Sequence, residues 1–525
     1  MSGYRHLGGN MLYPIGIQNF EKIRKDGYVY VDKTDLVYKM AKTGGYYFLS
    51  RPRRFGKSLL ISTLEAYFSG KKELFEGLKI ADLEKDWIQH PVLRFDMSGQ
   101  EYKNVADLSE ILYQHLKNME NLYGISPRFD SPESRFKDVI DAAYEKTGRR
   151  VVILIDEYDK PIVDNLGNDE LADALRRQLQ GFYSVMKAKD GFIQFGFLTG
   201  VTKIGKLSIF SGLNNLKDIS MDARYTDICG ISENDLTEYF SESVKELAEA
   251  NDLTVKEAYN QLAEMYDGYH FCEDSTGIYN PFSVLNTLDS KRFKEYWFET
   301  GTPSFLVKIM KDTDYDVTRL SFEQADTTLL TDIDSAFHNP IPLLYQSGYL
   351  TIKKYEPMFQ EYTLGIPNKE VRDGLLNSLI PHYVNPRRSD NNAFLLGFCK
   401  AVYRNDIEAA LEHMRTYMAT IPYDLENHSE KHYQTIFYLM FSFLNIYIRT
   451  EVKSAIGRAD AVMHMPDTIY VFELKVDKSA DEALAQIDEK GYMLPYHTEG
   501  KRLIKIGISF DSTQRTISDW KIKEE

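Results

Sequence analysis

The stretch that decides the fold runs from Tyr46 to Leu60 and reads YYFLSRPRRFGKSLL. An apolar run is followed by a short basic segment and then by the tripeptide Gly-Lys-Ser. The strict phosphate-loop pattern is G-x-x-x-x-G-K-[ST], and Arg51 stands here where the first glycine belongs. Lys57 still offers an ammonium to phosphate oxygens and Ser58 a hydroxyl to a metal ion, so the missing glycine weakens the match without removing its chemistry.

The other residues of this loop fit the same interpretation. Gly56 lets the backbone approach a phosphate closely, and Pro52 can shape the turn that the first glycine would otherwise make. We expect the nucleotide to contact the loop from Arg54 and Phe55 through Ser58. The arginines at positions 51, 53 and 54 either bind phosphate or lie on a solvated loop, and the sequence does not choose between these roles.

A second apolar run, VVILIDEYD at 151–159, ends in two acidic residues. It is typical of a strand whose first carboxylate, Asp156, holds Mg²⁺ through water and whose second, Glu157, polarises the attacking water. A third apolar run, FGFLTGVTK at 195–203, also ends in polar residues. Thr199 and Thr202 are the candidates for sensing the terminal phosphate, with a plain loop as the alternative.

The composition limits the class of protein. The length of 525 residues is enough for about two to four domains. With 43% hydrophobic residues, the chain can also bury a sizeable core. The 63 Lys and Arg against 78 Asp and Glu give a net charge of −15, which argues against a surface coated with basic charge but allows a local basic groove. The three cysteines suit neither a disulfide framework nor a zinc site. Without a signal segment or a long apolar run, we expect a cytoplasmic protein that does not span a membrane.

The order of the elements predicts a multidomain α/β protein. Apolar strands alternate with helices in the first part, which indicates a parallel sheet covered on both faces. A helical, winged-helix-like region follows, with Ser232 as the N-cap of its first helix, and the last part again mixes strands with helices. We therefore predict a P-loop NTPase domain at 1–230, a connector at 231–400 and a third domain at 401–525.

Acidic residues and a lysine gather near the carboxyl end of the chain. The segment from 460 to 476 reads as two strands joined by a Pro-Asp turn. The two-residue period of a strand places Glu473 and Lys475 on one face, and Asp460 begins the neighbouring strand. Asp460 and Glu473 would bind Mg²⁺, and Lys475 would orient a water or stabilise the charge that develops in phosphodiester hydrolysis. The alternative is a half-buried hairpin with an exposed Glu-Lys pair.

A helix should follow this hairpin. Ser479 and Glu482 form a capping-box pattern, and Gln486 lies beside the apolar stripe of the predicted helix. An apolar helix is also expected upstream, at 432–444. Further candidates of lower rank are Glu430, Gln434 and Glu451.

These motifs resemble a bacterial architecture that is common in gut anaerobes, an AAA-ATPase-like domain fused to a C-terminal PD-(D/E)XK nuclease-superfamily domain. The resembling segments include YPIGIQNF, FLSRPRRFGKSL, VVILIDEYDKP, YDGYHF, YNPFSVLN, GRADAV with YVFELK, and ALAQIDEKGY, and they span most of the chain. The form RPRRFGKS is itself typical of the family. The resemblance implies ATP at Gly56, Lys57, Ser58 and Asp156, and a nuclease-type centre at Asp460, Glu473 and Lys475.

Two functions follow from this reading. The first is an ATP-dependent, Mg²⁺-requiring nuclease that acts on DNA or RNA in defence against foreign nucleic acid. The second is a nucleotide-dependent switch whose nuclease fold only binds nucleic acid or protein. The complete set of two acids and a lysine favours the first, and the acidic net charge favours the second. The oligomeric state stays open, with a homo-oligomer as one alternative.

Overall fold

The computed structural model describes residues 11–203, 209–210, 213, 215–299, 304–313, 315–331, 339–383, 388–418, 439, 451–453, 461–514 and 516–525. The chain divides into two compact units. The first comprises Met1–Gly301 and Phe322–Val371, and the second comprises Thr302–Ser321 and Arg372–Glu525. The smaller domains predicted with boundaries near 230 and 400 remain a prediction.

A five-stranded, entirely parallel sheet forms the centre of the first unit, as the alternation of strands and helices predicts. The strand order is β2-β3-β4-β1-β5, so the strand that precedes the phosphate loop lies beside β4 and next to the edge. Every residue of β3 is buried, which is why its sequence is a continuous apolar run. The strands are, in chain order, β1 (Gly45–Ser50), β2 (Val92–Asp96), β3 (Val151–Asp156), β4 (Ile193–Gly200) and β5 (Leu216–Asp218).

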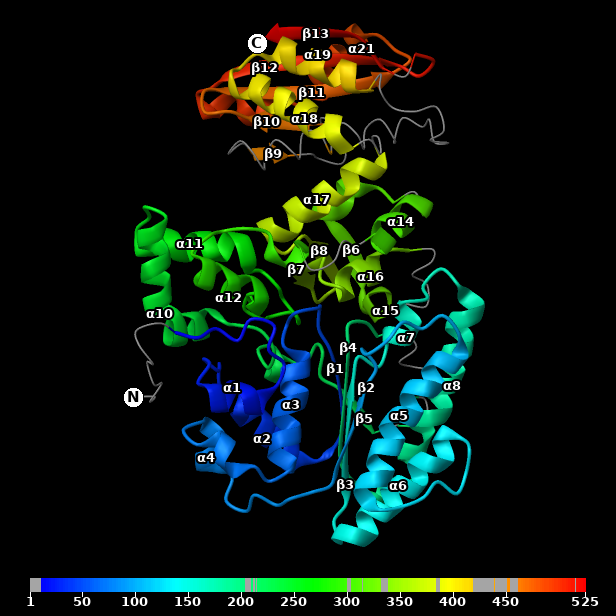
Figure 1. Cartoon of the computed structure of the whole chain (residues 1–525). Helices are drawn as coiled ribbons and strands as arrows, with labels where there is room; N and C mark the ends of the chain where they lie inside the picture. Colours follow the sequence, from blue (N-terminus) through cyan, green and yellow to red (C-terminus); the bar gives the residue numbers. More distant parts are fainter. Residues whose placement is uncertain are drawn as a thin grey trace. The chain divides into compact units, whose positions relative to one another are not determined.

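Helices cover both faces of this sheet (Figure 1). On one face lie α1, α2 and α3, and on the other lie α5, α6 and α8. The first residue of α3 is Lys57, directly after the left-handed Gly56, so the helix begins inside the phosphate loop. The helices are α1 (Phe20–Asp26), α2 (Thr34–Thr43), α3 (Lys57–Phe68), α4 (Lys79–Leu83), α5 (Val105–Tyr123), α6 (Pro132–Thr147), α7 (Lys160–Val163) and α8 (Asp169–Ala188).

The rest of the first unit is helical and carries a small antiparallel sheet of order β6-β8-β7, in agreement with the predicted helical, winged-helix-like region. Ser232 caps α10 as expected, and Asp235 completes a capping box. The elements are α10 (Glu233–Ala250), α11 (Val255–Tyr266), α12 (Pro281–Ser290), α13 (Tyr296–Glu299), β6 (Glu323–Asp326), α15 (Thr327–Thr331), α16 (Ile341–Gln346), β7 (Thr351–Glu356) and β8 (Glu361–Gly365).

The second unit contains a mixed sheet of order β13-β12-β11-β10-β9. The predicted hairpin is present as the antiparallel pair β10–β11, and β12 pairs with β11 in parallel. The predicted capping box of Ser479 and Glu482 starts α21. The elements are α14 (Ser304–Asp312), α17 (Lys369–Tyr383) from Arg372 onward, α18 (Arg388–Tyr403), α19 (Ile407–Met418), β9 (Glu451–Lys453), β10 (Ala461–His464), β11 (Thr468–Val476), α21 (Ala480–Glu489), β12 (Arg502–Asp511) and β13 (Thr516–Glu524).

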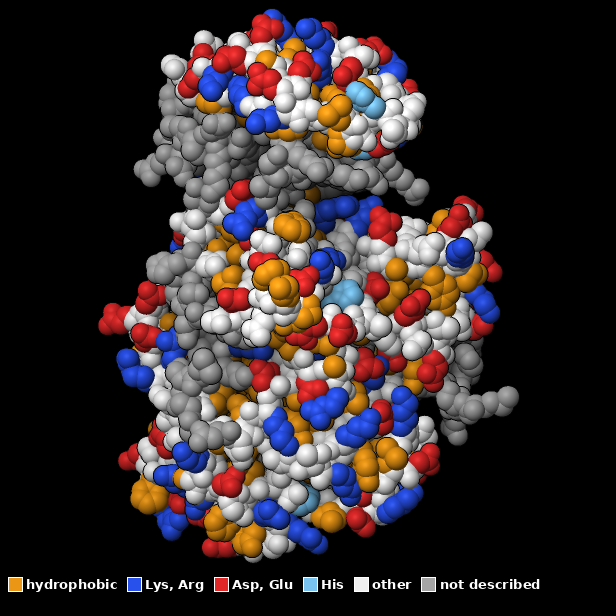
Figure 2. Space-filling model, turned by 180° about the vertical axis from the view of Figure 1, so that it is seen from behind, with side chains coloured by type: hydrophobic (Ala, Val, Ile, Leu, Met, Phe, Trp, Pro, Cys, Tyr) orange, Lys and Arg blue, Asp and Glu red, His pale blue; other side chains and the backbone are white. Residues whose placement is uncertain are grey.

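Two surface properties bear on function. Among the described residues, no helix combines the length and the apolar character that crossing a lipid bilayer requires. On the face shown in Figure 2, acidic and basic side chains are intermixed, so the described part of this face has no continuous basic coat.

Candidate functional site

The loop after β1 has the form of a phosphate loop around Lys57. The Lys57 ammonium donates hydrogen bonds to the carbonyl oxygens of Arg51 (2.8 Å) and Pro52 (3.0 Å), at the start of the same loop. An ammonium has three N–H groups, so these two bonds fix the direction of the third. Gly56 has φ = 95°, a left-handed conformation that suits glycine at this tight turn into the helix. The loop keeps its shape although its first glycine is an arginine.

Burial and nearby acids act on Lys57 in opposite directions. Burial is the larger effect and lowers the pKa of Lys57, and the neighbouring Glu157, Asp156 and Asp159 offset only part of that shift. The same burial raises the pKa of Glu157. A carboxylate with a raised pKa accepts a proton more readily, which suits the predicted role of polarising water.

Asp156 and Thr199 meet at the ends of the two neighbouring strands β3 and β4. The Thr199 hydroxyl donates a hydrogen bond of 2.7 Å to the Asp156 carboxylate. Both side chains are almost fully buried, at 1% and 0% exposure, whereas Glu157 is more accessible. The structure thus brings these two predicted residues together, and their roles as metal ligand and phosphate sensor stay predictions.

Asp159 is a candidate residue to which the sequence analysis gave no role. Its buried carboxylate accepts hydrogen bonds from the Thr202 backbone N–H (2.6 Å) and hydroxyl (2.7 Å), and from the Val201 N–H. Thr202, the alternative sensor, is thereby tied to the end of β3. Gly200 makes this contact fit, because a Cβ there would lie 2.5 Å from the Asp159 carboxylate. Asp159 joins the two strand ends at the site and also lines its cavity.

A cavity of about 470 Å³ opens in front of the loop, within the usual size range of small-ligand sites. It is lined by loop residues, by the acidic residues after β3, and by two segments from elsewhere in the sequence. One is the stretch 14–18 before α1, and the other is the start of α12. The lining residues are Pro14, Gly16, Ile17, Gln18, Arg53, Arg54, Gly56, Lys57, Ser58, Leu59, Ser98, Glu157, Asp159, Lys160, Val163, Asp164, Val201, Pro281, Phe282 and Leu285.

The sequence-based expectation for Arg51 is wrong, because this residue neither faces the phosphate cavity nor lies on a solvated loop. Arg51 is 1% exposed, and its guanidinium donates to the carbonyls of Ser50 (3.0 Å), Ser220 (2.7 Å) and Tyr225 (3.2 Å). It also stacks on Phe271, 3.9 Å from the ring centroid. Burial lowers the pKa of Arg51 to about 10, which leaves it charged at neutral pH.

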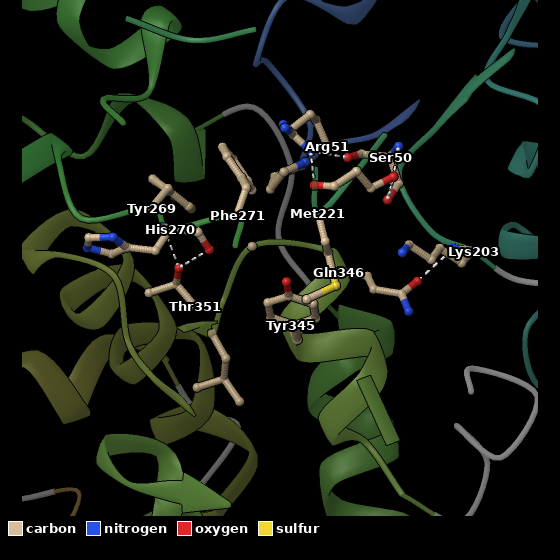
Figure 3. A pocket seen from close by; sticks show the side chains of 14 residues that line it. Ser50, Arg51, Lys203, Met221, Tyr269, His270, Phe271, Tyr345, Gln346 and Thr351 are labelled. Carbon is tan, nitrogen blue, oxygen red and sulfur yellow. Dashed lines mark hydrogen bonds between the residues drawn. The ribbon is translucent and has the colours of Figure 1, made fainter. Parts of the chain in front are cut away.

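Arg51 therefore anchors the loop from behind. Figure 3 shows Arg51 and Phe271 on the wall of a second cavity. This cavity has a volume of about 30 Å³ and is much smaller than the one beside Lys57. Phe55 lies in the same aromatic cluster, with ring centroids 4.8 Å from Tyr269 and 5.6 Å from Phe271. The side chain of Phe55 is thus buried.

Replacing Arg51 with glycine, which restores the strict motif, is expected to lower the free energy of unfolding by about 3 kcal/mol or more. The substitution leaves several buried carbonyls without their donor and opens a cavity beside Phe271. Urea unfolding measures the loss. The exposed neighbour supplies the control, since Arg53→Gly should change stability by less than about 1 kcal/mol. Equal stability of Arg51→Gly and wild type would contradict the anchoring role.

The second unit brings three of the predicted side chains together. Glu473 is only 2% exposed, and one of its carboxylate oxygens accepts hydrogen bonds from the Lys475 ammonium (3.1 Å) and from the Gln486 amide. Gln486 also lies 3.4 Å from the Tyr492 hydroxyl. The alternative of an exposed Glu-Lys pair is therefore wrong for Glu473.

The close approach of α21 to the sheet makes this cluster possible. Gly507 is the partner of Glu473 in the parallel pair β11–β12. A Cβ at Gly507 would lie 2.3 Å from the Ala480 carbonyl oxygen, so only glycine lets α21 pack directly on the strand. Because α21 packs this closely on the sheet, the Gln486 side chain lies within hydrogen-bonding distance of Glu473.

Several predicted residues lie outside the described part of the chain. They are Asp460, Glu430 and Gln434, together with nearly all of the predicted helix at 432–444. Glu451 starts β9, but its side chain is not described. Within the described residues, no group of three or more His, Cys, Asp or Glu side chains is arranged to hold a metal ion.

Comparison with known proteins identifies a family for each of the two parts of the chain that hold these residues. A family model described as "Predicted AAA-ATPase" matches residues 14–210, and one described as "PD-(D/E)XK nuclease superfamily" matches residues 428–520. A protein of Azotobacter chroococcum mcd 1, named "Uncharacterized protein in vnfD 5'region", is 35% identical over 515 residues, which cover 96% of this chain and 97% of that protein. The chain belongs to the AAA-ATPase-like proteins with a C-terminal PD-(D/E)XK nuclease-superfamily domain.

Membership in this family sets the general chemistry of the two sites. AAA-ATPase-like and PD-(D/E)XK domains generally use a nucleotide and a divalent metal ion, and a nuclease-superfamily domain indicates nucleic-acid binding. The ATPase-like match covers the phosphate loop and the ends of β3 and β4, and the nuclease-superfamily match covers β10, β11 and α21.

Proposed function

We propose that this AAA-ATPase-like protein is a Mg²⁺-dependent nuclease acting on DNA or RNA, and that ATP binding or hydrolysis controls its activity. The observation that carries the proposal is the convergence of Lys475 and Gln486 on the buried carboxylate of Glu473. Burying a carboxylate is costly unless it is paired, and a hairpin needs no such arrangement for its stability. A role in defence against foreign nucleic acid would fit such a protein.

ATP would occupy two adjoining spaces in the first unit. The triphosphate would lie in the 470 Å³ cavity, with Lys57 on its oxygens and Ser58 and Asp156 toward Mg²⁺. An apolar recess of about 100 Å³ shares Gly56, Leu59 and other residues with that cavity. The recess is lined mainly by aliphatic and aromatic side chains, which suits a nucleobase.

The residues of the nuclease site fit a hard divalent ion. Glu473 and Asp460 would supply oxygen ligands, the type that Mg²⁺ prefers. A bound metal ion would neutralise phosphate charge and lower the pKa of a water molecule. Lys475 would stabilise the charge that develops on the phosphate, and Gln486 would hold Glu473 in position.

The test is a cleavage assay of the full-length protein on single- and double-stranded DNA and RNA, with Mg²⁺ or with EDTA, and with ATP, ADP or no nucleotide. We expect cleavage of at least one substrate with Mg²⁺, none with EDTA, and a rate that changes with ATP. Cleavage that persists in EDTA would contradict the proposed metal dependence.

The alternative function is a nucleotide-dependent switch whose nuclease fold only binds nucleic acid or protein. The net charge of −15 favours the form of this switch that binds protein, because an acidic protein attracts nucleic acid weakly. If no substrate is cleaved although nucleotide is bound, the switch becomes the better description.

A further inference from the structure

Arg54 has a backbone conformation that is unusual for its residue type. Its φ is 68°, in the left-handed region, two residues before Gly56 at 95°. Glycine adopts this region freely, whereas a residue with a Cβ is strained in it. Strained residues are concentrated at functional sites, so the side chain of Arg54 calls for an explanation.

The guanidinium of Arg54 is held at the wall of the phosphate cavity. It lies over the ring of Phe282, 4.9 Å from the centroid, and both residues line the cavity together with Lys57 and Ser58. The backbone that carries Phe282 is fixed at the start of α12, because its N–H donates a hydrogen bond of 3.0 Å to the Asn280 side chain, which caps this helix. A cation over a ring is oriented but keeps its charge.

The cationic side chains around the cavity differ in the groups that they contact. Lys160 pairs with Asp164 at 2.6 Å, and the Lys57 ammonium donates hydrogen bonds to two loop carbonyls. In the described part of the chain, Arg53 and Arg54 are paired with no carboxylate. Two such arginines on the wall of one cavity favour a strongly charged anion there.

We propose that Arg54 binds the terminal phosphate of the nucleoside triphosphate and stabilises the charge of the phosphoryl group during hydrolysis, so that the chain supplies its own catalytic arginine. This rests on the proposed nucleotide function. In the step, a water oxygen bonds to the γ-phosphorus while the bond from that phosphorus to the β–γ bridging oxygen breaks. The water's proton passes by way of Glu157 to solvent, and the products are ADP and inorganic phosphate. Arg54 keeps its proton throughout.

The experiment compares ATP and ADP affinities of Arg54→Ala and wild type by calorimetry, together with single-turnover phosphate release. We expect Arg54→Ala to lower the affinity for ATP by about 10-fold and the affinity for ADP by less than about 3-fold. We also expect it to slow ATP hydrolysis by about 100-fold or more. Hydrolysis per chain should be constant on dilution of wild type, because no arginine from another copy is needed. Arg128, an exposed arginine paired with Asp138, supplies the control, and Arg128→Ala should change none of these values.

A glycine variant separates catalysis from folding. Arg54→Gly removes the guanidinium and relieves the strained φ, so its melting temperature should not fall below that of wild type although hydrolysis is slow. Equal weakening of ATP and ADP, unchanged hydrolysis, or activity per chain that falls on dilution would each overturn the proposal. If the wild-type protein binds no nucleotide at all, both this inference and the nucleotide half of the proposed function are overturned. If Arg54→Ala binds nucleotide with an unchanged ratio of ATP affinity to ADP affinity, this inference alone is overturned.

Discussion

Replacing Glu473 with glutamine is expected to reduce Mg²⁺-dependent cleavage by about 1,000-fold or more, which corresponds to about 4 kcal/mol of transition-state stabilisation. The substitution keeps the size of the side chain and its hydrogen-bonding capacity toward Lys475 and Gln486 but removes the charge that would hold a metal ion. Initial rates on the best substrate, measured over a range of Mg²⁺ concentrations, give the size of the loss.

The matched control is Glu524→Gln in the same unit. Glu524 is exposed and pairs with Arg502 on the edge strand β13, so its neutralisation should leave cleavage within about twofold of wild type. Circular dichroism should show both variants folded. If Glu473→Gln cleaved at the wild-type rate, the site assignment in the second unit would be wrong.

Replacing Lys57 with alanine is expected to weaken ATP binding by about 100-fold or more, because a buried ammonium aimed by two loop carbonyls would be lost. The change also leaves the carbonyls of Arg51 and Pro52 without their donor, so thermal melting must accompany the affinity measurement. Lys57→Met keeps most of the apolar stem and tests the charge alone.

Lys245, half-exposed on α10 and paired with Glu242, supplies the control for this loss, and Lys245→Ala should bind ATP like wild type. Unchanged ATP affinity of a folded Lys57→Ala variant would remove the loop from the nucleotide site. If nucleotide binding is lost while cleavage continues unaltered, the two sites do not communicate.

The sequence predicts much of this fold because local patterns carry it. The apolar run of β3, the N-cap at Ser232, the capping box at Ser479 and the Pro-Asp turn before β11 each specify an element within about ten residues. The face shared by Glu473 and Lys475 follows from strand periodicity alone.

What could not be predicted depends on contacts between distant residues. The burial of Arg51 requires Phe271 and the carbonyls of Ser220 and Tyr225, which no local pattern links to the loop. Likewise, the role of Asp159 appears only when the ends of β3 and β4 lie side by side. The contribution of Asp460 stays a prediction, since it lies outside the described residues.

The bracing of the phosphate loop has a consequence for how the protein is made. Arg51 stacks on Phe271, the Arg53 carbonyl accepts from the Trp297 indole, and Gly348 packs so closely on Pro52 that a Cβ would lie 2.7 Å from its ring. A chain still on the ribosome therefore cannot complete the loop until about 350 residues have emerged. A translation product that ends before Phe271 would lack all of these contacts, so its cationic loop would have none of these partners that hold it in the full chain.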